Sequence, residues 1–197
     1  HRRRHSFPTR RSSDLRTSHT HPLKIAEVRA NENFGFIGIT FCPGKYDRYA
    51  VTGIWERDLQ ADLDIIEAWN ASIVLTLMES DELRMLKVTE LGQEVTKRGM
   101  HWIHLPIKDF SVPDQQFEAR WLEEGKIIRN RLRAKENILV HCKGGLGRAG
   151  MIASRLLVEL GMEPVEAIRL VRHHRHGAIE TPGQLSVVRS TKAIMDE

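Results

Sequence analysis

Residues 138–150 of the chain read ILVHCKGGLGRAG, and this stretch decides the fold. Residues 137–141 form an apolar run that predicts a short buried strand, and the apolar run from Met151 to Leu160 predicts a helix. Cys142 therefore lies where a strand turns into a helix. The first amides of a helix have no partner inside the helix, and the helix dipole places partial positive charge beside them.

The glycines and the arginine of this turn give it the chemistry of an anion site. Gly144, Gly145 and Gly147 allow successive amides to turn inward and to cradle an oxyanion. A cysteine in such a cradle is expected to be a thiolate near neutral pH. Arg148 adds a planar guanidinium that fits two phosphate oxygens at once. A nucleophile, an anion nest and a bidentate cation together predict phosphoryl transfer to Cys142.

The motif His-Cys-x5-Arg, which spans His141 to Arg148, resembles the phosphate-binding loop of protein tyrosine phosphatases. Its Gly-Gly-Leu-Gly-Arg form resembles the dual-specificity group that contains the cyclin-dependent-kinase-associated phosphatase and its bacterial relatives. Three other segments resemble that group in the same order: FCPGK at 41–45, LPIKD at 105–109 and GAIET at 177–181. The resemblance covers about residues 35–190. It implies a cysteine-dependent phosphatase of phosphotyrosine, phosphoserine and phosphothreonine proteins that forms a phosphocysteine intermediate and needs no metal or organic cofactor.

The resemblance also implies three catalytic residues. Cys142 is the nucleophile, Arg148 holds the phosphate, and Asp109 of the Pro-Ile-x-Asp segment gives a proton to the leaving oxygen. Asp114 is the alternative acid, but the spacing Ser111-x-x-Asp114 resembles a capping box at the start of a helix. We therefore assign Asp109 to the chemistry and Asp114 to the cap.

The family's phosphate loop implies a set of substrate-binding residues: Lys143, Gly144, Gly145, Leu146, Gly147 and Arg148. Lys143 is either a solvated lysine at the edge of the loop or a residue that favours multiply phosphorylated substrates, including inositol phosphates. His141 is implied to orient the loop from behind and to help settle the thiolate. Gln184 is either part of a capping box that begins at Thr181 or a side chain that orients water for hydrolysis of the phosphocysteine.

Ala149 departs from the family pattern. Most members have Ser or Thr there, and that hydroxyl is thought to stabilise the departing thiolate, so slow breakdown of the phosphocysteine is expected. The departure also leaves open a phosphate-binding module with little turnover. Arsenate reduction is a further alternative, but it normally needs resolving thiols, and only Cys42 is available. Cys42 is interpreted as a small buried hydrophobe, with a protective disulfide to Cys142 as the alternative.

Strand and helix patterns alternate along the chain and predict an α/β fold of the protein-tyrosine-phosphatase type, with a mainly parallel central sheet and helices on both faces. The predicted strands are 35–41, 71–78, 101–107 and 137–141; the predicted helices are 56–70, 79–97 with a break near Gly92, one containing 117–132, 151–160, 163–176 and one that begins at Pro182. Ligands bind at the carboxyl ends of such strands, where Cys142 and Asp109 are expected to meet. The histidines near residue 174 lack metal-ligand spacing, so no metal is expected.

The excess charge of the chain is confined to its first residues. The formal net charge is +4, and residues 1–15 contain five Arg and one Asp, so the remainder, with 25 basic and 25 acidic residues, is neutral. This balance argues against nucleic-acid binding. Residues 1–15 also resemble the translation of a common DNA-sequencing adapter. Residues 1–22 are therefore expected to be non-native or disordered, and residues 23–197 to form a single phosphatase domain.

The remaining composition points to a cytoplasmic protein. No apolar run approaches the ~20 residues of a membrane span, and no signal-peptide pattern is present. Two cysteines are too few for a disulfide framework, which favours a reducing compartment. The expected partners are a phosphorylated protein or another phosphomonoester, with phosphate, sulfate or vanadate as active-site anions, and the oligomeric state stays open.

Overall fold

The computed structural model describes residues 15–197, and its centre is a five-stranded sheet in the order β2-β3-β8-β6-β7. The strands are β2 (Ala26–Val28), β3 (Ile37–Thr40), β8 (Asn137–His141), β6 (Ala71–Thr76) and β7 (His101–His104). β2 is antiparallel to β3, and the other neighbours are parallel. The predicted mainly parallel α/β fold is therefore confirmed, with an antiparallel strand at one edge.

β8 lies in the middle of the sheet because its side chains are apolar on both faces. Residues 138–140 are fully buried, as expected for a parallel strand with helices on either side. The register brings Thr40 of β3 and Thr76 of β6 opposite His141 at the end of β8. The carboxyl ends of three parallel strands therefore meet at the residue that precedes Cys142.

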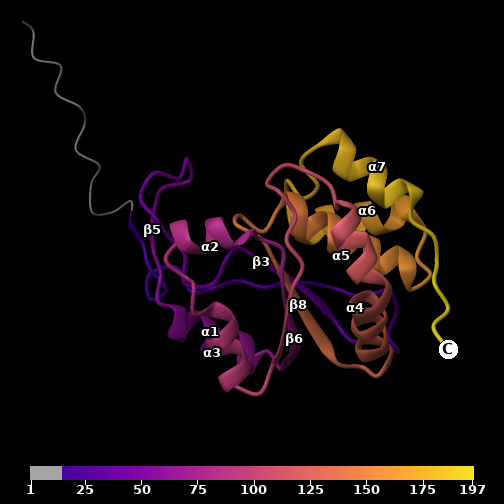
Figure 1. The fold of residues 1–197 in the computed structure, drawn as a ribbon, viewed down its shortest axis with the longest axis horizontal. Coiled ribbons are helices and arrows are strands. Elements are labelled where there is room, and N and C mark those ends of the chain that lie inside the picture. Colours follow the sequence, from indigo (N-terminus) through magenta and orange to yellow (C-terminus); the bar gives the residue numbers. More distant parts are fainter. Residues whose placement is uncertain (1–14) are drawn as a thin grey trace, which may run out of the picture.

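Helices cover both faces of this sheet, with α1 and α3 on one side and α4 to α7 on the other (Figure 1). Their bounds are α1 (Leu59–Ala68), α2 (Ser80–Met85), α3 (Leu91–Lys97), α4 (Gln115–Arg133), α5 (Gly147–Glu159), α6 (Pro164–His174) and α7 (Pro182–Ser190). α5 packs against β3 and β8, and α4 packs against β8. Within residues 15–197, no helix combines the length and the hydropathy of a membrane-spanning segment.

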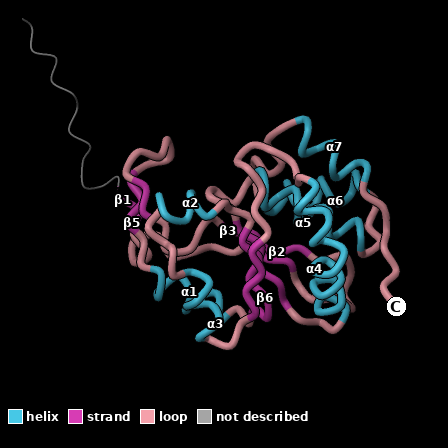
Figure 2. The backbone as a smooth tube through the Cα atoms, viewed as in Figure 1, coloured by secondary structure: helices cyan, strands magenta, loops and turns pink. Residues whose placement is uncertain are grey.

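A second, smaller sheet in the order β1-β5-β4 lies apart from the main sheet (Figure 2). Its strands are β1 (Leu15–Arg16), β4 (Tyr46–Asp47) and β5 (Ile54–Glu56). β1 pairs in parallel with β5, and Ser18 and Asp58 exchange two hydrogen bonds. These contacts fall within residues 15–22, part of the segment that is expected to be non-native or disordered, and they connect it to β5 and to the start of α1. The rest of that segment, residues 1–14, lies outside the described part of the chain.

The break in the predicted helix 79–97 falls elsewhere than expected. α2 and α3 are separated by residues 86–90, where Lys87 adopts a left-handed φ of 58°. Gly92 instead lies inside α3, where a Cβ would come within 2.3 Å of the Trp102 ring. The glycine therefore allows α3 to pack closely on β7 and does not interrupt the helix.

α5 begins four residues before the predicted start at Met151. The Gly150 amide donates to the Leu146 carbonyl at 2.8 Å and closes a first helical turn that the apolar pattern did not reveal. Arg148 and Ala149 are therefore the second and third residues of this helix.

Candidate active site

Residues 142–146 connect β8 to α5, and the His-Cys-x5-Arg motif ends in the first turn of this helix. Cys142 follows β8 directly and is 3% exposed, and Arg148 in the first turn of α5 is 2% exposed. The structure thus brings the predicted nucleophile and the predicted phosphate-binding cation together at a helix N-terminus, where the dipole favours negative charge.

Two cations hold the carbonyl groups of residues 143–145. Lys45 Nζ donates to the Lys143 carbonyl at 3.2 Å, and Arg175 donates to the next two carbonyls from Nη2 at 2.8 Å and from Nε at 2.9 Å. In a trans peptide, the N–H of the following residue points opposite to the carbonyl. The amides of residues 144–146 therefore face away from these cations, which is the orientation that the predicted anion nest requires.

Gly145 is the glycine that the loop requires on steric grounds. Its φ is 71°, and a Cβ there would lie 2.5 Å from the carbonyl carbon of Thr40 at the end of β3. A Cβ at Gly144, by contrast, would meet no described atom within 4 Å. The two adjacent glycines therefore have different roles. Gly145 allows the loop to pack against β3, and Gly144 leaves the rim of the loop open.

Glu82 of α2 fixes the guanidinium of Arg148, and sequence reasoning missed it. Glu82 Oε2 accepts from Nη1 at 2.7 Å and Oε1 accepts from Nη2 at 2.8 Å, while the Ile107 carbonyl accepts from Nη1 at 2.9 Å. The Nε–Nη2 edge of the fork is therefore the one that remains for an oxyanion. Burial opposes the charge of Arg148, but the hydrogen bond with Glu82 and the neighbouring negative groups outweigh burial and raise the Arg148 pKa above its ordinary value.

Asp109 lies beside the remaining edge of the fork. Its Oδ1 is 3.1 Å from Arg148 Nη2 and accepts from the Phe110 amide at 3.0 Å. Phe110 has a φ of 58°, which is costly for a residue with a side chain. This turn holds Asp109, which is 44% exposed, between Arg148 and solvent.

Asp114 caps helix α4 and does not contact Arg148 or Asp109 in the hydrogen bonds and ion pairs of the described residues. Its Oδ1 accepts from the Phe117 amide at 2.8 Å and caps α4. The assignment of Asp114 to a helix cap is confirmed. The predicted capping box with Ser111 is wrong, because α4 begins at Gln115 and Asp114 itself is the N-cap residue.

His141 lies behind the loop, fully buried in a chain of hydrogen bonds. Trp102 Nε1 donates to Thr76 Oγ1 at 2.8 Å, and Thr76 Oγ1 lies 2.7 Å from His141 Nε2. The other ring nitrogen of His141, Nδ1, lies 3.4 Å from the Cys142 carbonyl oxygen. Burial lowers the pKa of His141 to about 4, so the ring orients the loop in its neutral form.

We expect the free energy of unfolding to decrease as the pH falls from 6.5 to 4, and His141 to cause part of that loss. The unfolded chain binds a proton on His141 near the ordinary pKa of 6.5, whereas the folded chain binds it only near 4, so acid favours unfolding in this window. The contribution is on the order of 3 kcal/mol. Urea unfolding at pH 7 and pH 4.5 should show a smaller loss for His141→Gln than for wild type. The exposed His101→Gln should match wild type, and equal losses in all three proteins would contradict the prediction.

Gln184 forms the predicted capping box of α7. Its amide donates to Thr181 Oγ1 at 3.1 Å, and its Oε1 accepts from the amides of Glu180 at 2.9 Å and Thr181 at 3.3 Å. Its Nε2 also donates to the Ser111 carbonyl at 3.1 Å, which ties α7 to the loop that carries Asp109. The capping interpretation is confirmed, and the orientation of water by Gln184 stays a prediction.

Glu180 is a second carboxylate at the loop that sequence reasoning missed. Its Oε1 accepts from the Gly147 amide at 2.9 Å. This amide, which was expected to face the phosphate, is thus engaged by a protein carboxylate. The signal was present in the family-like segment 177–181, but a glutamate there gave no indication that it reaches back to the first residue of α5.

Cys42 lies next to the loop without bonding to its cysteine. Both Cys42 and Cys142 are free thiols. Cys42 is fully buried, burial raises its pKa, and its amide donates to the Lys143 carbonyl at 3.2 Å. The interpretation of Cys42 as a small buried residue is confirmed.

A cleft of about 750 Å³ opens beside Asp109 and Lys143, with walls from β4, the turn that follows it and α2. Its lining includes the aromatic and apolar residues Tyr46, Tyr49 and Met85, the cationic residues Lys87, Lys108 and Lys143, and the carboxylates Asp47, Glu79, Glu82 and Asp109. Lys143 is 44% exposed at the rim, and its Nζ lies 3.7 Å from Asp47. The lysine is therefore both solvated and close enough to the cleft to contact a ligand in it.

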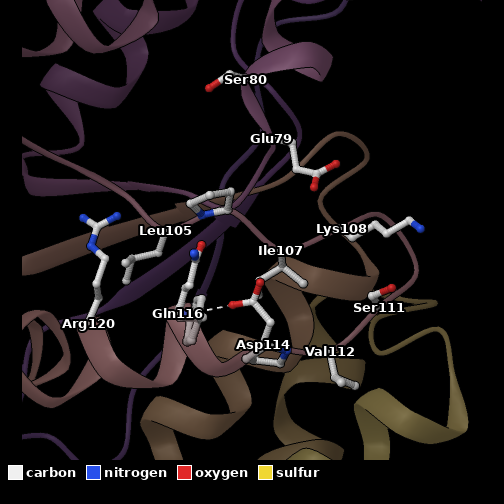
Figure 3. A pocket seen from close by; sticks show the side chains of 13 residues that line it. Glu79, Ser80, Leu105, Ile107, Lys108, Ser111, Val112, Asp114, Gln116 and Arg120 are labelled. Atoms are coloured by element: carbon white, nitrogen blue, oxygen red, sulfur yellow. Dashed lines mark hydrogen bonds between the residues drawn. The ribbon is translucent and has the colours of Figure 1, made fainter.

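A second hollow, of about 710 Å³, is lined in part by residues of the loop 108–114 (Figure 3). Figure 3 shows Glu79 on one side of this hollow and Gln116 and Arg120 of α4 on the other. None of the three predicted catalytic residues lines it. The hollow thus borders the Asp109 loop without being part of the reaction site.

Comparison with protein families and curated proteins gives matches over this same region. A family model described as "Polymorphic toxin system, DSP-PTPase phosphatase" matches residues 54–162. The probable protein tyrosine phosphatase type IVA B of Dictyostelium discoideum is 37% identical over 97 residues, which is 48% of this chain and 58% of the relative. The cyclin-dependent kinase inhibitor 3 of Homo sapiens is 27% identical over 162 residues, which is 81% of this chain and 71% of the relative.

Solved structures share the fold. A kinase-associated phosphatase with its catalytic cysteine replaced by serine superposes with a TM-score of 0.73 at 26% identity, covering 85% of this chain and 92% of that one. Tk-PTP in its active form superposes with a TM-score of 0.59 at 29% identity, covering 83% and 94%. The chain spans 58–59% of the length of the type IVA phosphatases that it matches.

Proposed function

The chain belongs to the DSP-PTPase phosphatase family, and on that premise we propose that it hydrolyses phosphomonoesters of proteins through a phosphocysteine intermediate. The kinase-associated phosphatase, which has a catalytic cysteine, supports this assignment through its superposition over most of both chains. Cys142 is the nucleophile, Arg148 and the loop amides bind the phosphate, and Asp109 is the general acid.

The arrangement around Arg148 is the observation that carries this proposal. Glu82 and the Ile107 carbonyl take three N–H groups of the guanidinium, so phosphate oxygens bind at Nε and Nη2. Asp109 Oδ1 lies 3.1 Å from Nη2, one of these two nitrogens. A bound phosphate therefore competes with Asp109 for Nη2 and frees the carboxyl group to face the leaving oxygen.

In the first step the Cys142 thiolate attacks phosphorus. The S–P bond forms as the P–O bond to the leaving group breaks, and Asp109 gives its proton to the leaving oxygen. The amides of residues 144–146 and the Nε–Nη2 edge of Arg148 stabilise the charge on the equatorial oxygens.

In the second step water hydrolyses the phosphocysteine. Asp109, now ionised, accepts a proton from the attacking water, the new P–O bond forms, and the S–P bond breaks to restore the Cys142 thiolate. Orientation of this water by Gln184 is part of the proposal, and the hydrogen bond from Gln184 Nε2 to the Ser111 carbonyl, which links the residue to the Asp109 loop, supports it.

Phosphoproteins are the substrate class that the surroundings favour. The cleft of about 750 Å³ beside Asp109 is far larger than a phosphate group. Tyr49 and Met85 in its walls are 92% and 77% exposed, which offers apolar area to a peptide on either side of the phosphoresidue. A cytoplasmic setting is proposed as well, because Cys142 must remain a free thiol to react.

Hydrolysis of a chromogenic aryl phosphate between pH 4 and 8, with no metal added, tests this function. Cys142→Ser should have no measurable turnover. The pH profile of kcat for Asp109→Asn should no longer depend on the protonation of a carboxyl group. Asp114→Asn is the matched control for Asp109→Asn, because it removes a carboxylate from the same loop region at a helix cap. Its pH profile should match that of wild type.

Two results would overturn the proposal. A folded wild-type protein that binds phosphate or vanadate but releases no product is a binding module. Full activity in Cys142→Ser would place the chemistry elsewhere.

A further inference from the structure

A cavity of about 490 Å³ lies on the carbonyl side of the phosphate-binding loop, between the loop and the small sheet. Gly144 and Leu146 of the loop and Trp55 of β5 line it. Its titratable lining residues are all basic: Arg16, His21, Lys24, Lys45, Arg57 and Arg175. The opposite face of the same loop forms the anion nest above Cys142.

Two aromatic rings hold three of these cations in place. The centroids of Phe41 and Trp55 are 5.0 Å apart. Lys45 Nζ lies 4.0 Å from the Trp55 centroid, Arg57 Cζ lies 4.7 Å from the Phe41 centroid, and Arg16 Cζ lies 5.2 Å from the Trp55 centroid. Cation–π contacts of this kind orient a charged group without neutralising it.

One of the five lysines and arginines has a carboxylate partner. Arg57 donates to both oxygens of the buried Asp62 at 2.9 Å. In the part of the chain that the structure describes, no ion pair neutralises Arg16, Lys24, Lys45 or Arg175. The lining cations and Asp62 therefore sum to a formal charge of +4, five cations less one carboxylate, and such a concentration of positive charge attracts anions.

Lys45 is the most deeply placed of these unneutralised cations. It is 5% exposed, and burial lowers its pKa to about 8, so it stays protonated at neutral pH. Its hydrogen-bond partner is the neutral Lys143 carbonyl, and Arg175 likewise donates to the neutral carbonyls of Gly144 and Gly145. These contacts satisfy donors but leave the positive charge in place.

We propose that this cavity binds a phosphoryl-type oxyanion, such as phosphate or sulfate, in addition to the phosphate held above Cys142. The anion supplies negative charge to the cations around it. Lys45 faces it from the buried part of the cavity, and Arg16 and Lys24 face it from the exposed wall. Its source is either a second phosphoryl group on the substrate or a separate free anion. The site does not depend on turnover, so it is testable apart from the proposed enzymatic function.

Crystals of the Cys142→Ser protein soaked in sodium tungstate test the site directly, because tungsten is located by its anomalous scattering. Two tungstate positions are expected, one in the anion nest and one in the cavity. Arg16→Glu with Lys24→Glu, added to Cys142→Ser, should retain the first position and lose the second. Lys126→Glu with Lys192→Glu changes the net charge equally at exposed sites elsewhere and should retain both. A single tungstate in the nest of the Cys142→Ser protein would overturn the proposal.

Steady-state kinetics of the enzyme with an intact Cys142 then identifies the source of the anion. If the second anion is part of the substrate, the Arg16→Glu/Lys24→Glu variant should have a KM at least about tenfold higher for an aryl bisphosphate and an unchanged KM for the monophosphate. If the second anion is separate from the substrate, the Arg16→Glu/Lys24→Glu variant should have unchanged KM values for both substrates. Crystals of the Cys142→Ser protein should still contain the second tungstate in that case. A lack of activity with both substrates would contradict the proposed function and leave the crystallographic result standing.

Discussion

Glu82→Ala is expected to lower kcat/KM for an aryl phosphate about 100-fold. Glu82 holds both Nη atoms of Arg148, at 2.7 and 2.8 Å, and its removal frees a buried guanidinium to rotate away from the phosphate. Loss of one partner of a buried, bidentate ion pair costs about 3 kcal/mol, which corresponds to about two orders of magnitude in rate. The phosphate-binding edge of Arg148 would then be aligned only by the Ile107 carbonyl and by Asp109.

Glu82→Gln separates charge from geometry. The glutamine keeps one oxygen that can accept hydrogen bonds from Arg148 and from the Glu79 amide. In wild type, Glu82 Oε2 accepts a hydrogen bond from the Glu79 amide at 2.8 Å as part of the α2 capping box. We therefore expect a loss of about tenfold in kcat/KM for this variant.

Asp81→Asn is the matched control, because it removes a carboxylate from the neighbouring position of α2, where the side chain is 80% exposed and pairs with Arg84. Its kcat/KM should stay within a factor of two of wild type, as expected for a surface ion pair. Circular dichroism should confirm that all three variants are folded. Wild-type kcat/KM in a folded Glu82→Ala would show that Arg148 does not need this anchor.

The parts of the fold that sequence predicts best are those with a continuous local pattern. The sequence predicts β8 with its observed bounds because the apolar residues 138–140 lie between polar residues and turn residues. The break between α2 and α3 was misplaced because Lys87 adopts a left-handed conformation that usually signals glycine, whereas Gly92 is a packing site against Trp102. Tertiary contact outweighed intrinsic preference at both positions.

The active site likewise contains local contacts, which the sequence predicts, and long-range contacts, which it does not. Cys142 and Arg148 lie six residues apart in one motif, so their meeting was visible in the chain itself. Glu82 accepts a hydrogen bond from Arg148, 66 positions away, and Glu180 accepts one from the Gly147 amide, 33 positions away. No motif around either glutamate indicates its partner. Such contacts follow from the packing of α2 and α7 around the sheet, which local patterns do not specify. The Gln184 capping box was predictable because all its atoms lie within four residues.

Ala149→Ser is expected to raise steady-state turnover 10- to 100-fold and to shrink a burst that wild type displays. In wild type, the first step should release about one equivalent of leaving group per active site, followed by slow hydrolysis of the phosphocysteine. Ala149 is the third residue of α5, fully buried, and supplies no hydroxyl to the thiolate that departs in the second step. A hydrogen bond to a charged group is worth ~1.5–3 kcal/mol, which gives the expected range of rates.

Rapid-quench measurement of leaving group and of protein-bound phosphate distinguishes this effect from simple repacking of the helix. Ala153→Ser places a hydroxyl one turn further along α5, again at a fully buried position, and should leave both burst and turnover unchanged. The helix already accommodates such a group, because Ser154 Oγ donates to the Gly150 carbonyl at 2.7 Å. A linear wild-type trace with no gain in Ala149→Ser would mean that phosphocysteine breakdown does not limit the rate. A burst that the serine removes would mean that Ala149 slows only the second step, which separates a slow phosphatase from a phosphate-binding module.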